Sequence, residues 1–322
     1  MSIRVGVVGA GHMGSYHVRI YSELYDVDLA GIADINKARA NELSNQYATK
    51  SYTDYHDLQG KVDAVSIAVP TTQHYEVAKF FLENGIHVLL EKPMTKTLEE
   101  GQELIELSRK NKLILNIGHV ERFNGAVQEL KNIIKNPIYI ETRRLGPYDP
   151  RIADVGIVMD LMIHDIDIVL NLVNKDIEKI NATGARVYSS NHEDIADIQI
   201  VFKGGCFANI TASRVTENKI RSLAVTQRDA YIFLDYTDQD LHIHRQAASH
   251  YILSKEVMRY KQESFIERLF IHKDNPLKLE IVHFLDCVTK KAIPIVTGES
   301  DLRSLNIALQ VEQLLRDQGV IK

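Results

Sequence analysis

The stretch IRVGVVGAGHMGSYHVRIY, residues 3–21, decides the fold of the first part of the chain. It starts with a continuous apolar run, IRVGVV, which is typical of a strand buried on both faces. Gly9, Gly11 and Gly14 follow directly in G-x-G-x-x-G spacing, and a helical pattern begins among them. The first glycine allows a tight turn, the second lets the backbone approach a pyrophosphate, and the third allows close packing of helix on strand. The stretch therefore predicts a strand–turn–helix unit that binds a dinucleotide.

An acidic residue stands where such a unit needs one. Asp34 ends a second apolar run, 27–34, and lies 20 residues beyond Gly14. A carboxylate at this position accepts hydrogen bonds from a ribose 2′-hydroxyl and repels a 2′-phosphate, so NAD is favoured as the cofactor. Lys37 and Arg39 follow closely and leave NADP possible.

Further apolar runs alternate with helical patterns at short spacing. The runs are 63–70, 87–93 and 113–119. Thr71 or Thr72 is expected to cap one helix, and Thr97 with Glu100 forms a capping box at the next. Continuous apolar strands alternating with helices indicate a parallel sheet covered on both faces. We expect an α/β, doubly wound Rossmann domain over residues 1–119.

The pattern changes beyond residue 120. The segment IADIQIVFKGGCFANITASR, 195–214, alternates on both sides of Gly204-Gly205, which indicates a hairpin. Other strand-like runs follow before two helical patterns close the chain. We expect residues 120–322 to form an α+β domain with a large, mostly antiparallel open sheet, for substrate binding and oligomerisation.

Composition limits the classes of protein that fit. The 322 residues carry a net charge of −5 without a dense basic run, which argues against nucleic acid as a partner. Only Cys206 and Cys287 are present, so a disulfide framework and a cysteine zinc site are excluded. No apolar run approaches the roughly 20 residues of a membrane span, and the N-terminal stretch does not fit a secretory signal. We expect a cytoplasmic protein.

The segment DLMIHDID, 160–167, carries three acids and one histidine among apolar residues. In a helix, Asp160, His164 and Asp167 share one face, because they stand at i, i+4 and i+7. Asp165 lies about 100° off that face. From these residues alone a metal site, a proton-transfer site and a polar patch in a core all remain open.

A resemblance extends these observations. Glu91-Lys92-Pro93 in HVLLEKPMTKT, at the end of a predicted strand and after the loop AVPTTQH (68–74), resembles the Gfo/Idh/MocA family of NAD(P)-dependent oxidoreductases. The resemblance covers essentially the whole chain. It implies cofactor contacts from the residues Gly9, Gly11, His12, Met13, Gly14, Asp34, Pro70, Thr71, His74 and Glu91.

The resemblance also implies a catalytic set of Lys92, Asp160 and His164. Histidine has an unperturbed pKa of about 6.5, which suits a base near neutrality, so His164 is the candidate base. Asp160 would orient the ring, and Lys92 would hold the reacting oxygen and stabilise its developing charge. A nicotinamide removes the need for a redox metal, so we expect none. The role of Asp167 stays open.

Substrate recognition is less constrained. Arg122 and Asn124, in GHVERFN, stand where the family has its substrate pocket, and the arginines Arg143 and Arg151 suit phosphates. Arg144, Arg214, Lys219 and Arg221 are further phosphate candidates, each with a solvated alternative. His242 and His244 alternate on one predicted strand, where solvent or a subunit interface is favoured over a metal.

The segment RIADVGIVMDLMIHDID, 151–167, looks most like the family branch that oxidises UDP-N-acetylglucosamine at C3. This implies an NAD(P)-dependent CH–OH dehydrogenase that makes a 3-keto sugar nucleotide. Two alternatives remain, a dehydrogenase of a free sugar or inositol and a non-catalytic NAD(P)-sensing regulator. Because family members use the open sheet face for subunit contacts, we also expect a homodimer or homotetramer.

Overall fold

The computed structural model describes residues 2–149, 155–254 and 257–322. The chain divides into two compact units. The first unit holds residues up to Phe123 together with Asn275–Asn306. The second unit holds Asn124–Asp274 together with Ile307–Lys322. The predicted boundary near residue 120 lies close to the observed one, but the assignment of all of 120–322 to one domain was wrong.

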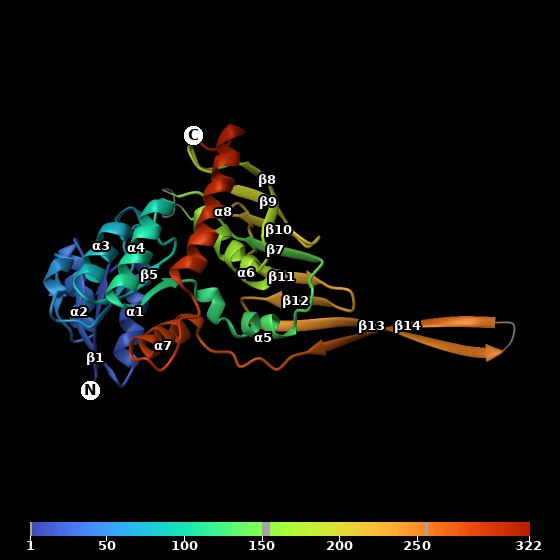
Figure 1. The fold of residues 1–322 in the computed structure, drawn as a ribbon, viewed down its shortest axis with the longest axis horizontal. Coiled ribbons are helices and arrows are strands. Elements are labelled where there is room, and N and C mark those ends of the chain that lie inside the picture. Colours follow the sequence, from blue (N-terminus) through green and yellow to red (C-terminus); the bar gives the residue numbers. More distant parts are fainter. Residues whose placement is uncertain (1, 150–154, 255–256) are drawn as a thin grey trace. The chain divides into compact units, whose positions relative to one another are not determined.

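The first unit is built on a parallel sheet with the strand order β3-β2-β1-β4-β5-β6 (Figure 1). This is the 3-2-1-4-5-6 order of dinucleotide-binding sheets, with the order reversing between β1 and β4. The strands are β1 (Ile3–Val8), β2 (Val27–Ala33), β3 (Ser51–Tyr52), β4 (Ala64–Ile67), β5 (His87–Glu91) and β6 (Leu115–Gly118). The prediction of a doubly wound parallel sheet is confirmed, whereas the short strand β3 has too few residues to show a pattern.

Helices flank this sheet. They are α1 (His12–Glu23), α2 (Lys37–Gln46), α3 (Thr71–Glu83), α4 (Leu98–Asn111), α7 (Pro276–Val288) and the first part of α8 (Gly298–Asp317), with short 3₁₀ turns η1 (Tyr55–Leu58) and η2 (Val120–Phe123). Thr97 caps α4 as predicted, accepting a hydrogen bond from the backbone N–H of Glu100. The predicted cap at Thr71 or Thr72 was wrong, because Pro70 takes the N-cap position of α3.

Helix α7 belongs to the first unit because its apolar face completes the core there. Ile281 and Phe284 are fully buried in the same cluster as Val5, Val18 and Leu89. A run of this kind predicts a helix, but it does not reveal which sheet the helix covers. The local sequence pattern therefore could not predict that α7 packs on the sheet of the first unit.

The second unit is built on an eight-stranded sheet, in the order β14-β13-β12-β11-β7-β10-β9-β8. All neighbours pair antiparallel except β7 and β10, which pair parallel. The strands are β7 (Tyr139–Leu145), β8 (Ile177–Ala185), β9 (Ile195–Phe202), β10 (Phe207–Ser213), β11 (Ile220–Thr226), β12 (Tyr231–Asp235), β13 (Asp240–Ser254) and β14 (Val257–Arg268). Gly204 and Gly205 turn β9 into β10 with φ of 92° and 90°, as the hairpin prediction required.

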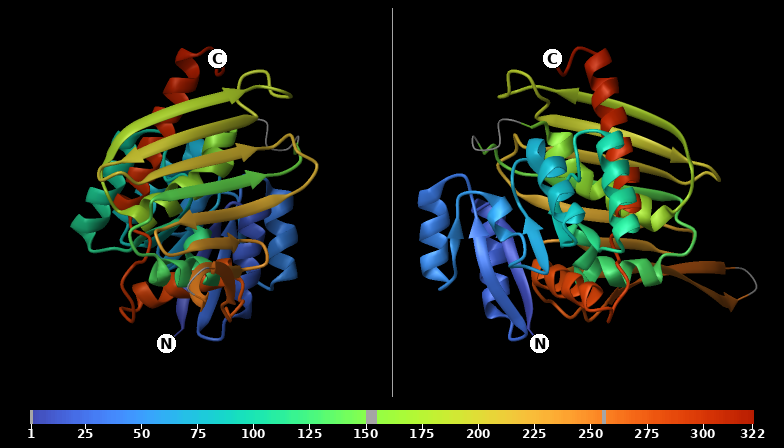
Figure 2. Two further views of the ribbon diagram at one scale, coloured as in Figure 1. Left: turned by 90° about the vertical axis from the view of Figure 1, so that its right-hand side faces the viewer. Right: turned by 60° about the vertical axis from the view of Figure 1, so that its left-hand side comes forward.

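One face of this sheet carries helices and the other does not, within the part of the chain that the structure describes (Figure 2, left). The helices of the unit are α5 (Gly125–Ile133), the π-turn η3 (Val158–Met162), α6 (Ile163–Val173) and the later part of α8. Beyond its pairing with β12, β13 continues with β14 as a two-stranded ribbon (Figure 1). No helix among the described residues is long and apolar enough to cross a membrane.

Candidate active site

The glycine turn lies where strands β1 and β4 diverge. Gly9 has a φ of +97°, and a Cβ built on Gly14 would lie 1.8 Å from the carbonyl oxygen of Gly9, so both positions require glycine. Gly11 is the N-cap of α1, and nothing lies within 4 Å of a Cβ built there. The backbone at Gly11 is therefore open to a close ligand, and the positive end of α1 favours an anion beside it. This cradle fits a pyrophosphate.

Asp34 accepts backbone hydrogen bonds in addition to its predicted role in binding the ribose. Its Oδ2 accepts a hydrogen bond from the backbone N–H of Ala10 at 2.6 Å, and its Oδ1 accepts one from Asn36 at 2.7 Å. A carboxylate offers about four acceptor sites, so two remain for ribose hydroxyls. Lys37 and Arg39 are exposed on α2. The residues present therefore fit NAD.

The end of β5 carries the Glu91-Lys92 pair. The Nε2 of His17, on α1, donates a hydrogen bond to Oε1 of Glu91 at 3.0 Å, and the side chains are 1% and 13% exposed. Burial alone would raise the pKa of Glu91, but the bond from His17 and the charges of His17 and Lys92 hold it below its usual value. Glu91 is thus an ionised group in a nearly dry site, beside a half-buried Lys92.

His74 does not fit the predicted role as a cofactor contact. Its ring is 1% exposed, with Nδ1 at 2.8 Å from the carbonyl oxygen of Pro93 and Nε2 at 2.9 Å from that of Val69. Burial lowers the pKa of this histidine. Both ring nitrogens are taken up by the protein, so His74 ties the loop after β4 to the loop after β5. Pro70 and Thr71 stand in the first of these loops, at the start of α3.

Glu280, on α7, is a buried acid that the sequence pattern did not single out. It is 1% exposed, and neither carboxyl oxygen has a hydrogen-bond partner among the residues that the structure describes. Burial, together with the charge of Glu91, raises its pKa well above the usual value. Burial therefore favours the protonated form of Glu280.

This shift has a measurable consequence. A raised pKa in the folded state contributes stability that is complete below the unfolded pKa, about 4.3, and is lost as the pH rises. Glu280→Gln cannot ionise, so its Tm relative to the wild type should increase steadily from pH 4 to pH 8. Thermal melts across this range check it. A difference in Tm that stays constant with pH would contradict the assignment.

In the second unit, Asp160 and His164 lie where the π-turn η3 runs into α6. Both side chains are half-buried, whereas Asp165 and Asp167 are each 1% exposed. The expected face of Asp160, His164 and Asp167 is therefore only partly right, because Asp167 is enclosed. The π-turn was not predicted. Such turns are rare and often occur at functional sites.

The start of this helix is held by a residue far along the chain. Oε1 of Glu193 accepts a hydrogen bond from the backbone N–H of Val158 at 2.9 Å, and its carbonyl oxygen accepts one from Ile157 at 3.1 Å. A Cβ built on Gly156 would lie 2.2 Å from the Glu193 carboxylate, so only glycine fits there. Burial raises the pKa of Glu193. Sequence reasoning missed this anchor, since no local motif announces it.

The arginines near residue 143 separate onto two faces. Arg144 is 2% exposed and donates two hydrogen bonds to Asp165, from Nε at 2.7 Å and from Nη2 at 3.2 Å. Arg143, its neighbour on β7, is exposed and therefore points to the opposite, open face. Arg143 thus lies on the face opposite the one that α6 covers, and its predicted substrate contact stays a prediction.

Other predicted substrate contacts are also occupied. Asn124 is buried, caps α5 by accepting the N–H of Ala126, and donates its Nδ2–H to the carbonyl oxygen of Tyr236. Its side chain therefore has a structural role, and its predicted substrate contact stays a prediction. Arg214 is buried in an ion pair with Asp194, which removes it as a phosphate candidate.

The other predicted site residues are Arg122, Arg151, Lys219, Arg221, His242 and His244, and their roles stay predictions. Arg122 is 8% exposed, in the 3₁₀ turn η2 at the end of the first unit. Arg151 lies outside the described residues. Lys219 and Arg221 border β11. His242 and His244 are half-buried on the open face of β13, and no group of three metal-ligating side chains occurs among the described residues.

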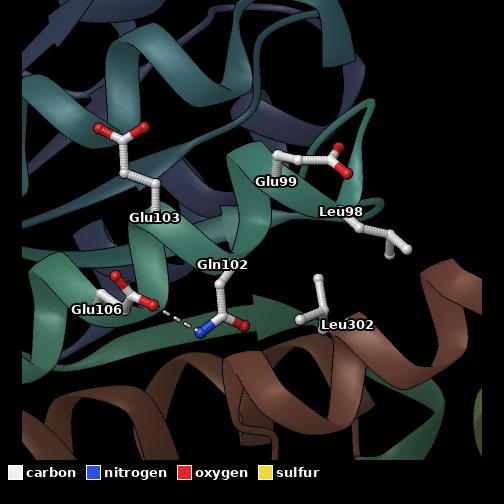
Figure 3. A pocket seen from close by; sticks show the side chains of 6 residues that line it. All are labelled: Leu98, Glu99, Gln102, Glu103, Glu106 and Leu302. Atoms are coloured by element: carbon white, nitrogen blue, oxygen red, sulfur yellow. Dashed lines mark hydrogen bonds between the residues drawn. The ribbon is translucent and has the colours of Figure 1, made fainter.

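A surface hollow on the first unit belongs to none of these sites (Figure 3). It lies between α4 and the first part of α8 and is lined by Leu98, Glu99, Gln102, Glu103, Glu106 and Leu302. Gln102 donates a hydrogen bond to Glu106 at 2.9 Å, and Glu103 accepts one from Lys79 at 2.6 Å. These acids are solvated or paired, and none of the predicted site residues lines the hollow.

Comparison with known proteins agrees with this geometry. Residues 3–119 match the oxidoreductase family with an NAD-binding Rossmann fold, and residues 125–232 match the GFO/IDH/MocA C-terminal domain. The chain is 33% identical, over 96% of each chain, to UDP-N-acetylglucosamine 3-dehydrogenase of Acidithiobacillus ferrooxidans. The chain is a Gfo/Idh/MocA oxidoreductase. As a member of that family it is an NAD-dependent dehydrogenase acting on CH–OH groups.

Two further comparisons describe this Gfo/Idh/MocA oxidoreductase. A solved structure of the Acidithiobacillus ferrooxidans enzyme matches it with a TM-score of 0.87 and 32% identity, covering 98% of both chains. Myo-inositol 2-dehydrogenase of Thermotoga maritima is 25% identical, covering 99% of this chain and 98% of its own. Relatives that act on two kinds of substrate thus align with nearly the whole molecule.

Proposed function

We propose that this Gfo/Idh/MocA oxidoreductase oxidises the C3 hydroxyl of UDP-N-acetylglucosamine with NAD, giving the 3-keto sugar nucleotide. The observation that carries the proposal is the 33% identity to a UDP-N-acetylglucosamine 3-dehydrogenase, which extends over both units. The inositol dehydrogenases align at lower identity over the whole chain, or at 30% over 62% of it.

The proposed chemistry divides among three side chains. His164, which is half-buried, takes the proton of the reacting hydroxyl, because an imidazole nitrogen can act as a general base. Asp160 orients the ring and stabilises its protonated form. Lys92, beside the ionised Glu91, holds the reacting oxygen with its ammonium group as negative charge develops. NAD, when bound, would supply the acceptor for the hydride that leaves the carbon.

We propose that residues of the first unit bind the cofactor. The turn of Gly9, Gly11 and Gly14 and the adjacent backbone of His12 and Met13 hold the pyrophosphate, and Asp34 holds the adenosine ribose. Thr71, Pro70 and Glu91 border the carboxyl ends of β4 and β5, where an open α/β sheet binds its ligand.

A second candidate function is oxidation of a free sugar or inositol, because inositol dehydrogenases are among the full-length relatives. The two candidates differ in the uridine diphosphate group. Arg143 and Arg151 are the arginines that the sequence analysis suggested for its phosphates.

A substrate screen separates the two. The enzyme with NAD should form NADH with UDP-N-acetylglucosamine, and mass spectrometry should show that the sugar nucleotide has lost two hydrogens. Free N-acetylglucosamine and myo-inositol, at the same concentration, should give at most a small fraction of that rate. If a polyol is oxidised and no UDP-sugar is, the nucleotide-sugar proposal fails and the inositol alternative takes its place.

We also propose that the enzyme is a homo-oligomer and that it is cytoplasmic. The sheet face without helices exposes Tyr231, which is 43% exposed on β12, and would be covered in a homodimer or homotetramer. Cys206 and Cys287 are free thiols, which suits a reducing cytoplasm.

A further inference from the structure

The carboxylate of Glu91 is held by a residue that does not belong to its own strand. His17 reaches it from α1 with the 3.0 Å hydrogen bond to Oε1. Gly118 is the partner of Glu91 on the neighbouring strand β6, and a Cβ built there would lie 3.0 Å from Oε2. A side chain at residue 118 would press on the carboxylate, so glycine leaves room for the position that His17 holds.

The charges that face Glu91 come from every element packed on the end of β5. His17 stands on α1, His74 on α3, Lys92 at the strand end and Glu280 on α7. The three bases lower the pKa of Glu91 against the burial that raises it. Burial and the charge of Glu91 raise the pKa of Glu280, so the two acids are shifted in opposite directions.

His17 is the member whose position matters most. It is 1% exposed, and it stands three residues after Gly14, in the first turns of the helix that begins at the glycine turn. Its Nδ1 has no hydrogen-bond partner among the described residues, and its Nε2 bonds Glu91. The ring therefore connects the cofactor-binding helix to the strand that ends in Glu91-Lys92.

We propose that His17 is a positioning residue for Lys92, acting through Glu91. By donating its Nε2–H, His17 keeps Glu91 ionised and fixed at the end of β5. The carboxylate in turn places a fixed negative charge beside Lys92, which the reaction needs to hold the developing alkoxide. The inference rests on the proposed function, because the role of Lys92 is part of it.

The test compares two substitutions at one position. His17→Leu removes the donor, whereas His17→Gln retains an N–H at nearly the same distance from the backbone. His17→Leu should lower kcat up to about 100-fold, since displacement of a catalytic group by about 1 Å can have such an effect. KM for NAD should change little. The acid limb of the pH profile of kcat/KM should move to higher pH, because burial then dominates the pKa of Glu91.

His17→Gln should restore most of kcat and the wild-type acid limb. Tyr21→Phe is the matched control, because it removes a buried hydrogen bond, to Ser66 at 2.7 Å, from the same helix without touching Glu91. It should lower Tm and leave the pH profile in place. If His17→Leu and Tyr21→Phe behave alike, His17 has only a packing role and the proposal is overturned.

A readout without turnover separates this inference from the substrate assignment. The ¹³Cδ signal of Glu91, assigned with Glu91→Gln in protein with NAD bound, reports the titration of the carboxyl group directly. In His17→Leu it should titrate at higher pH than in the wild type, whichever substrate the enzyme uses. An unchanged titration would refute the inference and leave the proposed function standing. If the titration shifts but no UDP-sugar is oxidised, the inference about His17 stands and the proposed function fails.

Discussion

His164→Asn is expected to lower kcat by about 100- to 10,000-fold while NAD binds as in the wild type. Asparagine retains a polar side chain of similar reach but cannot accept a proton near neutrality. The half-buried position of His164, beside enclosed neighbours at 165 and 167, means that the substitution changes one accessible group. Initial rates and a binding titration with NAD measure the two quantities separately.

The control for this prediction is His242→Asn, which alters a half-buried histidine on the open face of the same unit. It should leave kcat within about twofold of the wild type, as surface substitutions usually have small effects. If His164→Asn retains turnover, another group is the base. In that case the same assay on Lys92→Met decides whether Lys92 fills the role.

Asp165→Asn should destabilise the second unit by about 3–5 kcal/mol, the usual effect of removing one partner of a buried ion pair. Asp165 accepts both hydrogen bonds of Arg144, whose guanidinium also lies 5.0 Å from the centre of the Tyr236 ring. Both charged side chains are at most 2% exposed. Without the carboxylate, the arginine is left charged and dry. Denaturant unfolding measures the loss.

The matched control is Asp176→Asn, which breaks an ion pair with Lys203 in the same unit. That pair spans 3.2 Å, and its side chains are 77% and 67% exposed. Its loss should cost at most about 1 kcal/mol. The double substitution Arg144→Met with Asp165→Leu should regain much of the stability, because no unpaired charge remains. Equal losses for Asp165→Asn and Asp176→Asn would contradict the structural role of the pair.

The fold could be predicted where its signals are local. Gly9 and Gly14 admit no side chain, and Asp34 follows at the distance that one βαβ unit imposes. Each of these facts is visible within 34 residues. The long apolar runs likewise predicted the parallel strands, because burial on both faces leaves no alternation.

What escaped prediction depends on contacts between distant residues. The bond from His17 to Glu91 joins residues 74 positions apart, and Glu193 meets the helix of Asp160 from a different strand hairpin. The sheet face on which Arg143 lies was not predicted for a related reason. Its neighbour Arg144 has the same chemistry, and only the pleat of β7 decides which of them faces α6.

The close approach of Gly156 to Glu193 constrains how related sequences can diverge. A methyl group at residue 156 would overlap the carboxylate, so the carboxylate of Glu193 would have to move or be shortened. Either change would weaken its hydrogen bond from the N–H of Val158. Across the family the two columns should therefore vary together, and the pair can serve as a marker of lineages that begin this helix in the same way.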